Sequence, residues 1–414
     1  MSKDIKVGVI GISRGMSFAH GAALAGMKLV ALCDKWEERL MSAEVGDDVA
    51  RYTDYNEFLR HDMDAVVLAN YFHEHAPFAI KALRSGKHVL SETMCNATLS
   101  EGVELCQAVE DTGLIYMLAE NYPYTKFNQE LRRIYKSGEL GRATYAEGEY
   151  NHPMSAHARN EISQGRYHWR NWLPPSYYCT HALAPLIYIT ELMPKSVVCL
   201  SIPAPEVAKG TMIVGDKGYA ALCQMENDAV FRLFGLSLPG HSNFYRIHGT
   251  KGAAEILRGP GYFGPEQIRV WHEPWNMPPD QPEERVYVPS WPERGELAEK
   301  AGHGGGDFWT EFYFAEAIRT KTQPFLDVYR GVAMSSLGIL AWRSALSGGM
   351  PQQIPDFKDK SDRKKYENDN INPFPVPGEK EHALYPSVHG KYTPSAEDEA
   401  AARSVWEKQG FLGE

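Results

Sequence analysis

A glycine-bearing turn directly after an apolar segment is the first feature of this sequence with a chemical implication. Residues 7–10 are apolar, and Gly11, Ile12, Ser13, Arg14 and Gly15 follow them before a stretch that favours a helix. A tight strand-to-helix turn presents backbone N–H groups and the positive end of a helix dipole, which suit a pyrophosphate. Ser13 replaces the middle glycine of the G-x-G-x-x-G pattern and Gly15 lies one position early, so the turn alone fits an ordinary strand–turn–helix corner equally well.

An acidic residue at the end of the second apolar segment strengthens the dinucleotide interpretation. Asp34 follows residues 29–33, and its separation from Gly11 is close to the interval of about 20 residues at which a carboxylate meets the adenine ribose. A carboxylate there accepts hydrogen bonds from the ribose hydroxyls and repels a 2′-phosphate. The sequence therefore predicts NAD rather than NADP, against the alternative of a surface aspartate that begins the next helix.

Other residues with metal-binding or stacking chemistry give weaker indications. The six cysteines are scattered without a C-x-x-C spacing and indicate reduced, mostly buried thiols. His73 and His75 lie two residues apart, but no third ligand is visible, so we predict no metal site. Three tryptophans in a Pro-rich region fit either a sugar-stacking surface or, more commonly, local loop packing: Trp271, Trp275 and Trp291.

Composition limits the class of protein and of partner. The chain has 414 residues, of which 43% are hydrophobic and 23% charged, and its formal net charge is -10. This profile is typical of a globular protein with two or three domains, and the acidic excess disfavours nucleic acid and anionic lipid as partners. The N-terminus leads at once into an apolar strand, and no apolar run is long enough to span a bilayer. We expect a cytoplasmic protein with a small-molecule ligand.

The first part of the chain alternates strand-like and helix-like segments. Short β-branched runs at residues 7–10, 29–33, 65–69, 88–90 and 115–118 are separated by segments, such as 76–84 and 99–109, with apolar residues at helical spacing. This alternation predicts an α/β Rossmann domain with a doubly wound parallel sheet over residues 1–122.

Beyond residue 122 the pattern changes. After a helix at 127–135, strand-like runs at 143–150, 197–202, 219–225 and 229–237 follow one another without long intervening helices, and helical spacing returns at 308–347. We predict an α+β domain over residues 123–350 with a largely antiparallel open sheet. Residues 351–414 are expected to form an extended tail with a short helix at 395–406, wrapped over the surface or over a neighbouring subunit.

Several motifs resemble the family of glucose–fructose oxidoreductase, inositol dehydrogenase and MocA. Residues 69–75 resemble the A-T-P-x-x-x-H element of that family, residues 85–92 its A-G-K-H-V-x-x-E-K-P element, and residues 137–142 and 324–333 fit the same pattern. The resemblance covers roughly residues 5–350. It implies NAD as cofactor and a cofactor site that, besides the glycine turn and Asp34, includes Asn70, His75, Glu92, Asn121 and Arg170, with His75 beside the nicotinamide and Arg170 as a clamp on cofactor or substrate.

The sequence departs from the dehydrogenases of that family at two positions. The lysine that follows the glutamate of E-K-P is absent, because Glu92 is followed by Thr93 and Met94. In the segment that matches D-x-G-x-H, the histidine remains as His181, but Tyr177 occupies the aspartate position. An alcohol needs a positioned base before it can be oxidised at neutral pH, so these departures disfavour a standard dehydrogenase site.

Glycoside hydrolase family 109, the NAD-dependent glycosidases, fits these departures better. Residues 178–185 resemble its Y-x-T-H-G-L-G-P element, with alanines at 182 and 184 in place of glycines, and Tyr150-Asn151-His152 resembles its Y-x-H element. The resemblance implies transient oxidation of the sugar C3 hydroxyl, loss of the C2 proton, elimination at C1, and addition of water. It assigns His181 to the C3 hydroxyl proton, Tyr178 to the C2 proton, and Tyr150 and His152 to the leaving group or the water.

Three functions remain open at this point. The sequence favours a redox-assisted glycosidase that retains its NAD. The alternatives are a sugar or polyol dehydrogenase that uses NAD as a dissociating cosubstrate, and a nucleotide-bound regulatory or assembly protein without catalysis. We also expect a homo-oligomer, because the exposed face of an open sheet is commonly covered by a second subunit.

Overall fold

The chain folds into two compact units, described here from a computed structural model. The structure describes residues 4–257, 267–277, 279, 281–375, 384–411 and 413. One unit comprises Met1–Arg133, Pro289–Ser335 and Pro355–Asp369, and the other comprises Ile134–Val288, Ser336–Ile354 and Asn370–Glu414. The sequence analysis placed its boundaries at residues 122 and 350, whereas each observed unit is assembled from three separated segments. Within the described residues, no helix is long and apolar enough to cross a membrane.

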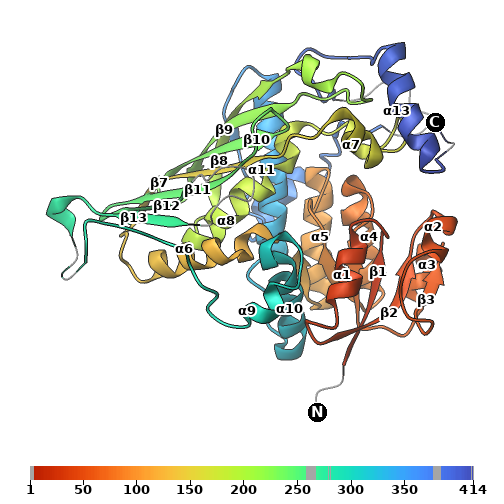
Figure 1. The fold of residues 1–414 in the computed structure, drawn as a ribbon, viewed down its shortest axis with the longest axis horizontal. Helices are drawn as coiled ribbons and strands as arrows, with labels where there is room; N and C mark the ends of the chain where they lie inside the picture. Colours follow the sequence, from red (N-terminus) through yellow and green to blue (C-terminus); the bar gives the residue numbers. More distant parts are fainter. Residues whose placement is uncertain are drawn as a thin grey trace. The chain divides into compact units, whose positions relative to one another are not determined.

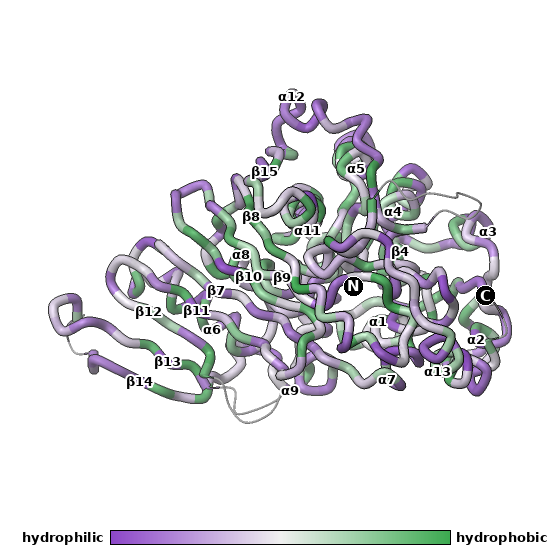
Figure 2. Tube along the Cα trace, turned by 90° about the horizontal axis from the view of Figure 1, so that it is seen from above, coloured by the Kyte–Doolittle hydropathy of each residue, from purple (hydrophilic) through white to green (hydrophobic). Residues whose placement is uncertain are grey.

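The first unit contains a six-stranded parallel sheet (Figure 1). The strands are β1 (Ile5–Ile10), β2 (Met27–Cys33), β3 (Ala50–Tyr52), β4 (Ala65–Leu68), β5 (His88–Ser91) and β6 (Tyr116–Leu118), in the order β3-β2-β1-β4-β5-β6. This order is that of a doubly wound dinucleotide-binding fold and confirms the predicted Rossmann architecture. Every residue of β4 is buried, and β4 appears as a continuous apolar segment in Figure 2, as expected of a parallel strand covered on both faces.

Short helices connect these strands. They are α1 (Gly15–Gly21), α2 (Glu37–Met41), α3 (Tyr55–Leu59), α4 (His75–Arg84) and α5 (Leu99–Thr112). A capping box between Thr98 and Glu101 begins α5, and Gly113 ends it in the left-handed conformation. The same unit also holds α9 (Gly295–Ala298), α10 (Gly306–Thr320) and α12 (Lys360–Arg363), and α10 packs against α1. The sequence analysis did not identify α2, α3 or β3.

The second unit is organised around a nine-stranded mixed sheet. Its strands are β7 (Ala143–Asn151), β8 (Pro194–Ile202), β9 (Gly218–Met225), β10 (Val230–Leu236), β11 (Ser242–Gly249), β12 (Ala253–Ile256), β13 (Ile268–Trp271), β14 (Glu284–Tyr287) and β15 (Gln352–Gln353). Adjacent strands pair antiparallel except β7 and β10, which are parallel. Buried and exposed residues alternate along β9, so one face of the sheet is covered and the other is open. The predicted α+β class is confirmed.

Helices of the second unit cover one face of this sheet. The helix α8 (Thr180–Thr190) packs on β7, β10 and β11, and every residue of α8 is buried. Two helices, α6 (Lys126–Lys136) and α11 (Val328–Leu346), each cross from one unit to the other. Near the C-terminus, α13 (Ala396–Lys408) begins with a capping box at Ser395 and packs on α7 (Ala156–Glu161). The tail helix was predicted, with its start placed one residue early.

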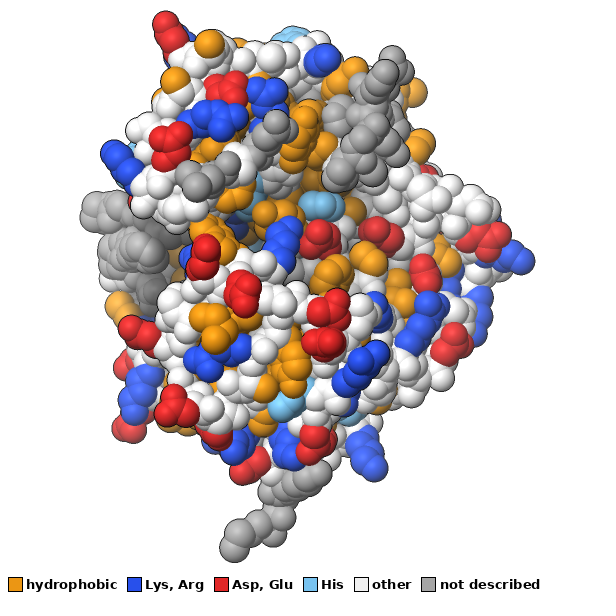
Figure 3. All heavy atoms as spheres, turned by 90° about the vertical axis from the view of Figure 1, so that its right-hand side faces the viewer, with side chains coloured by type: hydrophobic (Ala, Val, Ile, Leu, Met, Phe, Trp, Pro, Cys, Tyr) orange, Lys and Arg blue, Asp and Glu red, His pale blue; other side chains and the backbone are white. Residues whose placement is uncertain are grey.

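The surface carries both signs of charge. On the face drawn in Figure 3, Lys and Arg side chains are interspersed with Asp and Glu side chains. Such mixing is typical of a soluble surface and forms no extended basic area on this face.

Candidate active site

The glycine turn after β1 has the geometry that a nucleotide-binding loop requires. Gly11 has φ +89°, a conformation that favours glycine, and a Cβ at this position would lie 2.2 Å from the carbonyl oxygen of Ala69. The turn is thus held against the segment that follows β4, and no side chain fits between them. A tight turn of this kind leaves room for a pyrophosphate beside the backbone.

Asp34 lies at the end of β2, where the sequence analysis placed the ribose-binding carboxylate. Its Oδ2 accepts a hydrogen bond from the backbone N–H of Ile12 at 2.9 Å, and its Oδ1 accepts one from Trp36 N–H at 2.9 Å. These bonds fix the carboxylate next to the glycine turn, and each oxygen keeps a lone pair that can accept a ribose hydroxyl. The position therefore fits the predicted preference for NAD.

The other predicted cofactor residues of this unit follow neighbouring strands. Asn70, Glu92 and Asn121 come after β4, β5 and β6 respectively. Because parallel strands end at one edge of the sheet, these side chains share the carboxyl edge with the glycine turn and Asp34. Oδ1 of Asn70 is buried and meets no hydrogen-bond partner within the described residues, which leaves an acceptor for a ligand.

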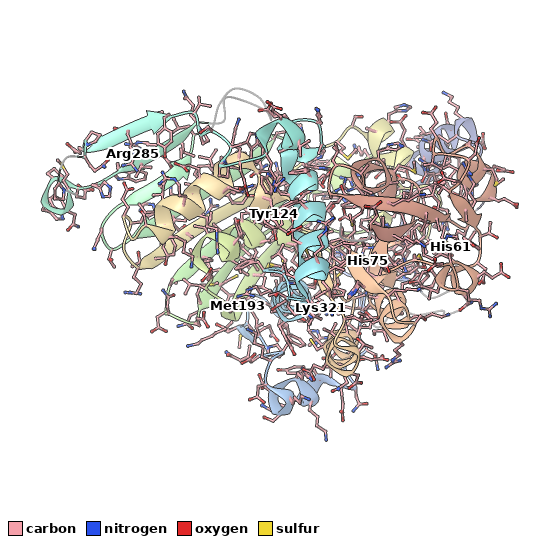
Figure 4. The ribbon with its side chains drawn as sticks, turned by 90° about the horizontal axis from the view of Figure 1, so that it is seen from below. His61, His75, Tyr124, Met193, Arg285 and Lys321 are labelled. Carbon is pink, nitrogen blue, oxygen red and sulfur yellow. The ribbon has the colours of Figure 1, made fainter. Side chains whose placement is uncertain are left out.

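His75 begins α4 and is 2% exposed (Figure 4). Its Nδ1 lies 3.0 Å from the carbonyl oxygen of Met94, and its Nε2 is buried without a partner among the residues that the structure describes. Burial lowers the pKa of His75, so the ring is neutral at pH 7. A fixed neutral imidazole with one free nitrogen fits the predicted place beside a cofactor.

Arg14 has a different environment from the one predicted. Its Nε donates to Glu92 at 2.7 Å, and its two terminal nitrogens bind Asp307 of α10 at 2.8 and 2.7 Å. Asp307 also accepts from Asn121 at 2.9 Å and lies 2.9 Å from Nδ1 of His303. Burial alone would raise the pKa of Asp307, but the bonds and charges of His303 and Arg14 hold it well below its ordinary value. Arg14, Glu92 and Asn121 thus join the edge of the sheet to α10.

In the second unit, a glycine lets α8 approach β7 closely. A Cβ at Gly148 would lie 2.0 Å from the carbonyl oxygen of Ala182. Alternate residues of a strand share a face, so Tyr150 and His152 follow Gly148 on the side where α8 packs. The hydroxyl of Tyr245 in β11 donates to the carbonyl oxygen of His181 at 2.6 Å and fixes the start of α8. These contacts place His181 beside Tyr150.

All four predicted catalytic side chains come together in this unit. The rings of Tyr150 and His181 lie 4.5 Å apart edge to face, and the rings of Tyr178 and His181 lie 4.9 Å apart. Tyr150 stacks on Tyr178 and on His152, each at 6.0 Å. His181 is 9% exposed, and the other three are partly exposed. We call this group the Tyr–His cluster. Their catalytic roles stay a prediction.

The pKa of His152 in the Tyr–His cluster is lowered from its ordinary value. Burial lowers it, and the neighbouring His241, Arg159 and His181 act in the same direction. The ring of His241 lies 5.4 Å from that of His152. His152 is therefore neutral at pH 7 and can accept a proton.

Two cations beside the cluster were not identified from the sequence. Arg159 in α7 donates to the hydroxyl of Ser237 at 3.3 Å. Lys217, 3% exposed, directly precedes β9, and its carbonyl oxygen accepts the N–H of Ser237 at 2.9 Å. No local sequence signal marks either residue, because they meet only through the ends of β8, β9 and β10.

The remaining predicted residues have mixed outcomes. Arg170 belongs to the second unit, and its guanidinium lies 4.2 Å from the ring of Trp169; a role toward the cofactor stays a prediction. Tyr177 is fully buried, so it does not replace the aspartate of the dehydrogenases in an open site. Trp291 packs against Trp309 in the first unit, which fits the loop-packing alternative. Within the described residues, no group of His, Cys, Asp and Glu could hold a metal ion, and all six cysteines are free and buried.

Two separate parts of the chain match known protein families. Residues 5–120 match the oxidoreductase family with an NAD-binding Rossmann fold. This part of the chain is therefore an NAD-binding domain, which confirms NAD as the predicted cofactor. Residues 206–364 match the C-terminal domain of glycosyl hydrolase 109. The two matches confirm both resemblances: the N-terminal part is similar to the NAD-binding domain of an oxidoreductase family, and the C-terminal part to the C-terminal domain of glycosyl hydrolase 109.

Relatives and solved structures point the same way. A glycosyl hydrolase family 109 protein of Solibacter usitatus is 26% identical over 392 residues, with 85% of this chain and 88% of that protein covered. A glycosyl hydrolase family 109 protein of Akkermansia muciniphila is also 26% identical, with coverages of 85% and 83%. A levoglucosan dehydrogenase in complex with NADH and L-sorbose has a TM-score of 0.71 at 20% identity, covering 86% of this chain and 100% of that chain. A myo-inositol 2-dehydrogenase from Lactobacillus plantarum has a TM-score of 0.63 at 20% identity, covering 85% of this chain and 100% of that chain. At this identity the structural likeness concerns the fold.

Proposed function

We propose that the protein is an NAD-dependent glycoside hydrolase that cleaves its substrate through transient oxidation of the sugar C3 hydroxyl. The observation that carries the proposal is the Tyr–His cluster, in a chain that also has an NAD-binding domain and matches the GH109 C-terminal domain. A carbohydrate substrate is further supported by structures of similar fold that hold levoglucosan or sorbose.

The composition of the cluster suits several proton transfers around one sugar ring. Bound NAD would supply a reversible two-electron oxidation of the C3 hydroxyl to a ketone. His181 accepts the proton of that hydroxyl, and Tyr178 removes the C2 proton, which the adjacent ketone makes acidic. Tyr150 and His152 protonate the departing C1 group and then deprotonate the water that adds at C1. Tyr178 returns a proton to C2, and return of the hydride to C3, with the proton from His181 to the C3 oxygen, would complete a turnover with no net change in NAD. Phenol and neutral imidazole each donate and accept protons, as these roles require.

The carboxylate next to Tyr150 in sequence is not available as the nucleophile of an ordinary glycosidase mechanism. Such enzymes place two carboxyl groups about 5 to 10 Å apart across the glycosidic bond. Glu149 neighbours Tyr150 in β7 but alternates to the opposite face, where it binds Arg232 and the hydroxyl of Ser242. It is therefore committed to a contact within the sheet and unsuited to the role of nucleophile.

The experiment separates hydrolase from dehydrogenase by stoichiometry. Purified enzyme is incubated with nitrophenyl α- and β-glycosides of common hexoses and N-acetylhexosamines, with and without added NAD, while nitrophenol and NADH are both measured. We expect nitrophenol release over many turnovers with no net NADH. Accumulation of NADH in proportion to product would instead support the dehydrogenase. A chain that binds NAD but acts on no sugar would favour the regulatory protein.

A further inference from the structure

A group of cations lies where several strands of the second unit end. Lys217 N–H donates to the carbonyl oxygen of Ile202, the last residue of β8, and the Lys217 carbonyl accepts from Ser237, just after β10. The Ser237 hydroxyl accepts from Arg159. His152 N–H donates to the Leu236 carbonyl at 2.8 Å, which brings the end of β7 to the same place. Arg159 and Lys217 are thus held beside the Tyr–His cluster.

These cations form no ion pair with the described part of the chain. Within the described residues, no carboxylate lies at ion-pair distance from Arg159, Arg170 or Lys217. Asp216 directly precedes Lys217 in the sequence, but its carboxylate accepts from the hydroxyl of Ser201 at 2.7 Å and from Val388 N–H at 3.1 Å. The Lys217 ammonium donates to the carbonyl oxygen of Gly215. Among the described residues, the three positive charges are therefore compensated only in part, by the more distant charge of Asp216.

The energetic consequence is a preference for an incoming negative charge. A buried ammonium without an anionic partner is unfavourable. Burial, and to a lesser degree the charge of Arg159, lower the pKa of Lys217 to about 7, while Asp216 opposes the shift. Burial, followed by the charge of Arg170, lowers the pKa of Arg159 to about 10, while Tyr178 and Tyr150 oppose this shift. An anion beside Arg159 would relieve these repulsions and favour protonated Lys217.

We infer that Arg159, supported by the buried Lys217 and by Arg170, binds an anionic substituent of the substrate, so that the preferred sugar carries a carboxylate or a sulfate ester. This inference rests on the proposed function only for the statement that the ligand is a sugar. Arg159 is partly exposed and presents the planar donor fork that matches such an anion, whereas Lys217 adds charge from within the fold.

The test measures binding rather than turnover. Enzyme saturated with NAD is titrated calorimetrically with methyl α- and β-glycosides of glucuronic and galacturonic acid, with the 6-sulfates of glucose and galactose, and with the neutral parent glycosides. At least one anionic ligand should bind about 10-fold or more tightly than its neutral parent, the difference expected for a charged hydrogen bond. The uronic acid and sulfate arms identify which anion is preferred.

Three variants assign the effect to these residues. Arg159→Gln and Lys217→Met should each reduce the affinity for the anionic ligand toward that of the neutral one. Lys195→Met, which removes an exposed lysine near the start of β8, should retain the wild-type preference. The unfolding temperature of each variant shows that it is folded.

The outcomes separate this inference from the proposed function. The inference would be overturned if every anionic glycoside bound with the same affinity as its neutral parent. It would also be overturned if Arg159→Gln reduced the affinities for the anionic and the neutral glycoside by the same factor. The latter would indicate that Arg159 acts on Tyr178 or Tyr150 instead. Preference for an anionic glycoside that is never hydrolysed would support the anion site and contradict the proposed hydrolase.

Discussion

Cations at the carboxyl edge of the first unit and beside the Tyr–His cluster of the second differ in their partners. At the edge, Arg14 is paired with two carboxylates, and Asp307 in turn contacts Asn121 and His303. Beside the cluster, Arg159 and Lys217 have hydroxyl and carbonyl acceptors. Charges that are balanced within the fold hold elements in place, whereas unbalanced buried charge costs stability unless a ligand compensates it. We therefore expect the ion pairs of Arg14 to hold the carboxyl edge of the sheet and α10 in place, and Arg159 and Lys217 to bind a ligand.

The largest effect should come from the cluster itself. His181→Ala or Tyr178→Phe should lower kcat by about 10²- to 10⁴-fold, because each removes a positioned proton acceptor. The dissociation constant for NAD should stay within about twofold of the wild-type value, measured by fluorescence titration. Tyr177→Phe is the matched control, since this neighbouring tyrosine is fully buried, and it should retain most of the activity. A parallel loss of NAD affinity in His181→Ala would contradict the separation of roles.

The second effect concerns the buried ion pair at the edge. Asp307→Asn should lower the free energy of unfolding by about 3 kcal/mol, because it leaves Arg14 without its bidentate partner. The folded pKa of Asp307 is depressed, so its contribution exists above the ordinary pKa of an aspartate and is lost as the pH falls. Acid should therefore destabilise the wild type more than the variant, as followed by chemical denaturation. Glu316→Gln, at an exposed pair in the same helix, should cost less than about 1 kcal/mol.

A third comparison uses the two close backbone approaches. Gly11→Ala should weaken NAD binding and cost about 1 to 3 kcal/mol of stability, because φ is +89° and the added methyl meets the Ala69 carbonyl. Gly148→Ala should displace α8 and lower kcat while NAD affinity is preserved. Gly138→Ala, at φ +81° with open space around it, measures the conformational cost alone. If Gly11→Ala and Gly148→Ala reduced NAD affinity equally, the assignment of NAD binding to the first unit and catalysis to the second would be refuted.

The smallest effect is a pH dependence of stability at Lys217. The folded pKa of about 7 is lower than the ordinary 10.5, so between these values the unfolded chain binds more protons and stability rises with pH. Lys217→Met should be more stable than the wild type at pH 7, and the difference should shrink by about 1 kcal/mol between pH 7 and pH 8. Denaturation curves at both pH values measure it. A stability difference that stays constant between pH 7 and pH 8 would show that Lys217 remains charged in the folded protein and would contradict the account.

The sequence was sufficient for the architecture and for part of the site. Continuous apolar runs identified the parallel strands. Asp34 was proposed from its spacing to Gly11, and Asn70 and Glu92 from the family resemblance; their cofactor roles stay predictions. The Tyr–His cluster was predicted from motif resemblance, since 31 positions separate Tyr150 from His181 in the sequence. Contacts that depend on sheet register and on distant helices were not predictable from local pattern. The pairing of Arg14 with Asp307, the place of Lys217 and the parallel pairing of β7 with β10 are of this kind.

Solvent exchange at the sugar C2 tests the proposed mechanism most directly. The enzyme with NAD would hydrolyse its best glycoside in deuterium oxide, and the product would be examined by mass spectrometry and proton NMR. We expect one deuterium at C2 and no net NADH, because Tyr178 exchanges its proton with solvent while the C3 ketone exists. Hydrolysis that leaves C2 fully protonated would contradict the oxidation and elimination steps.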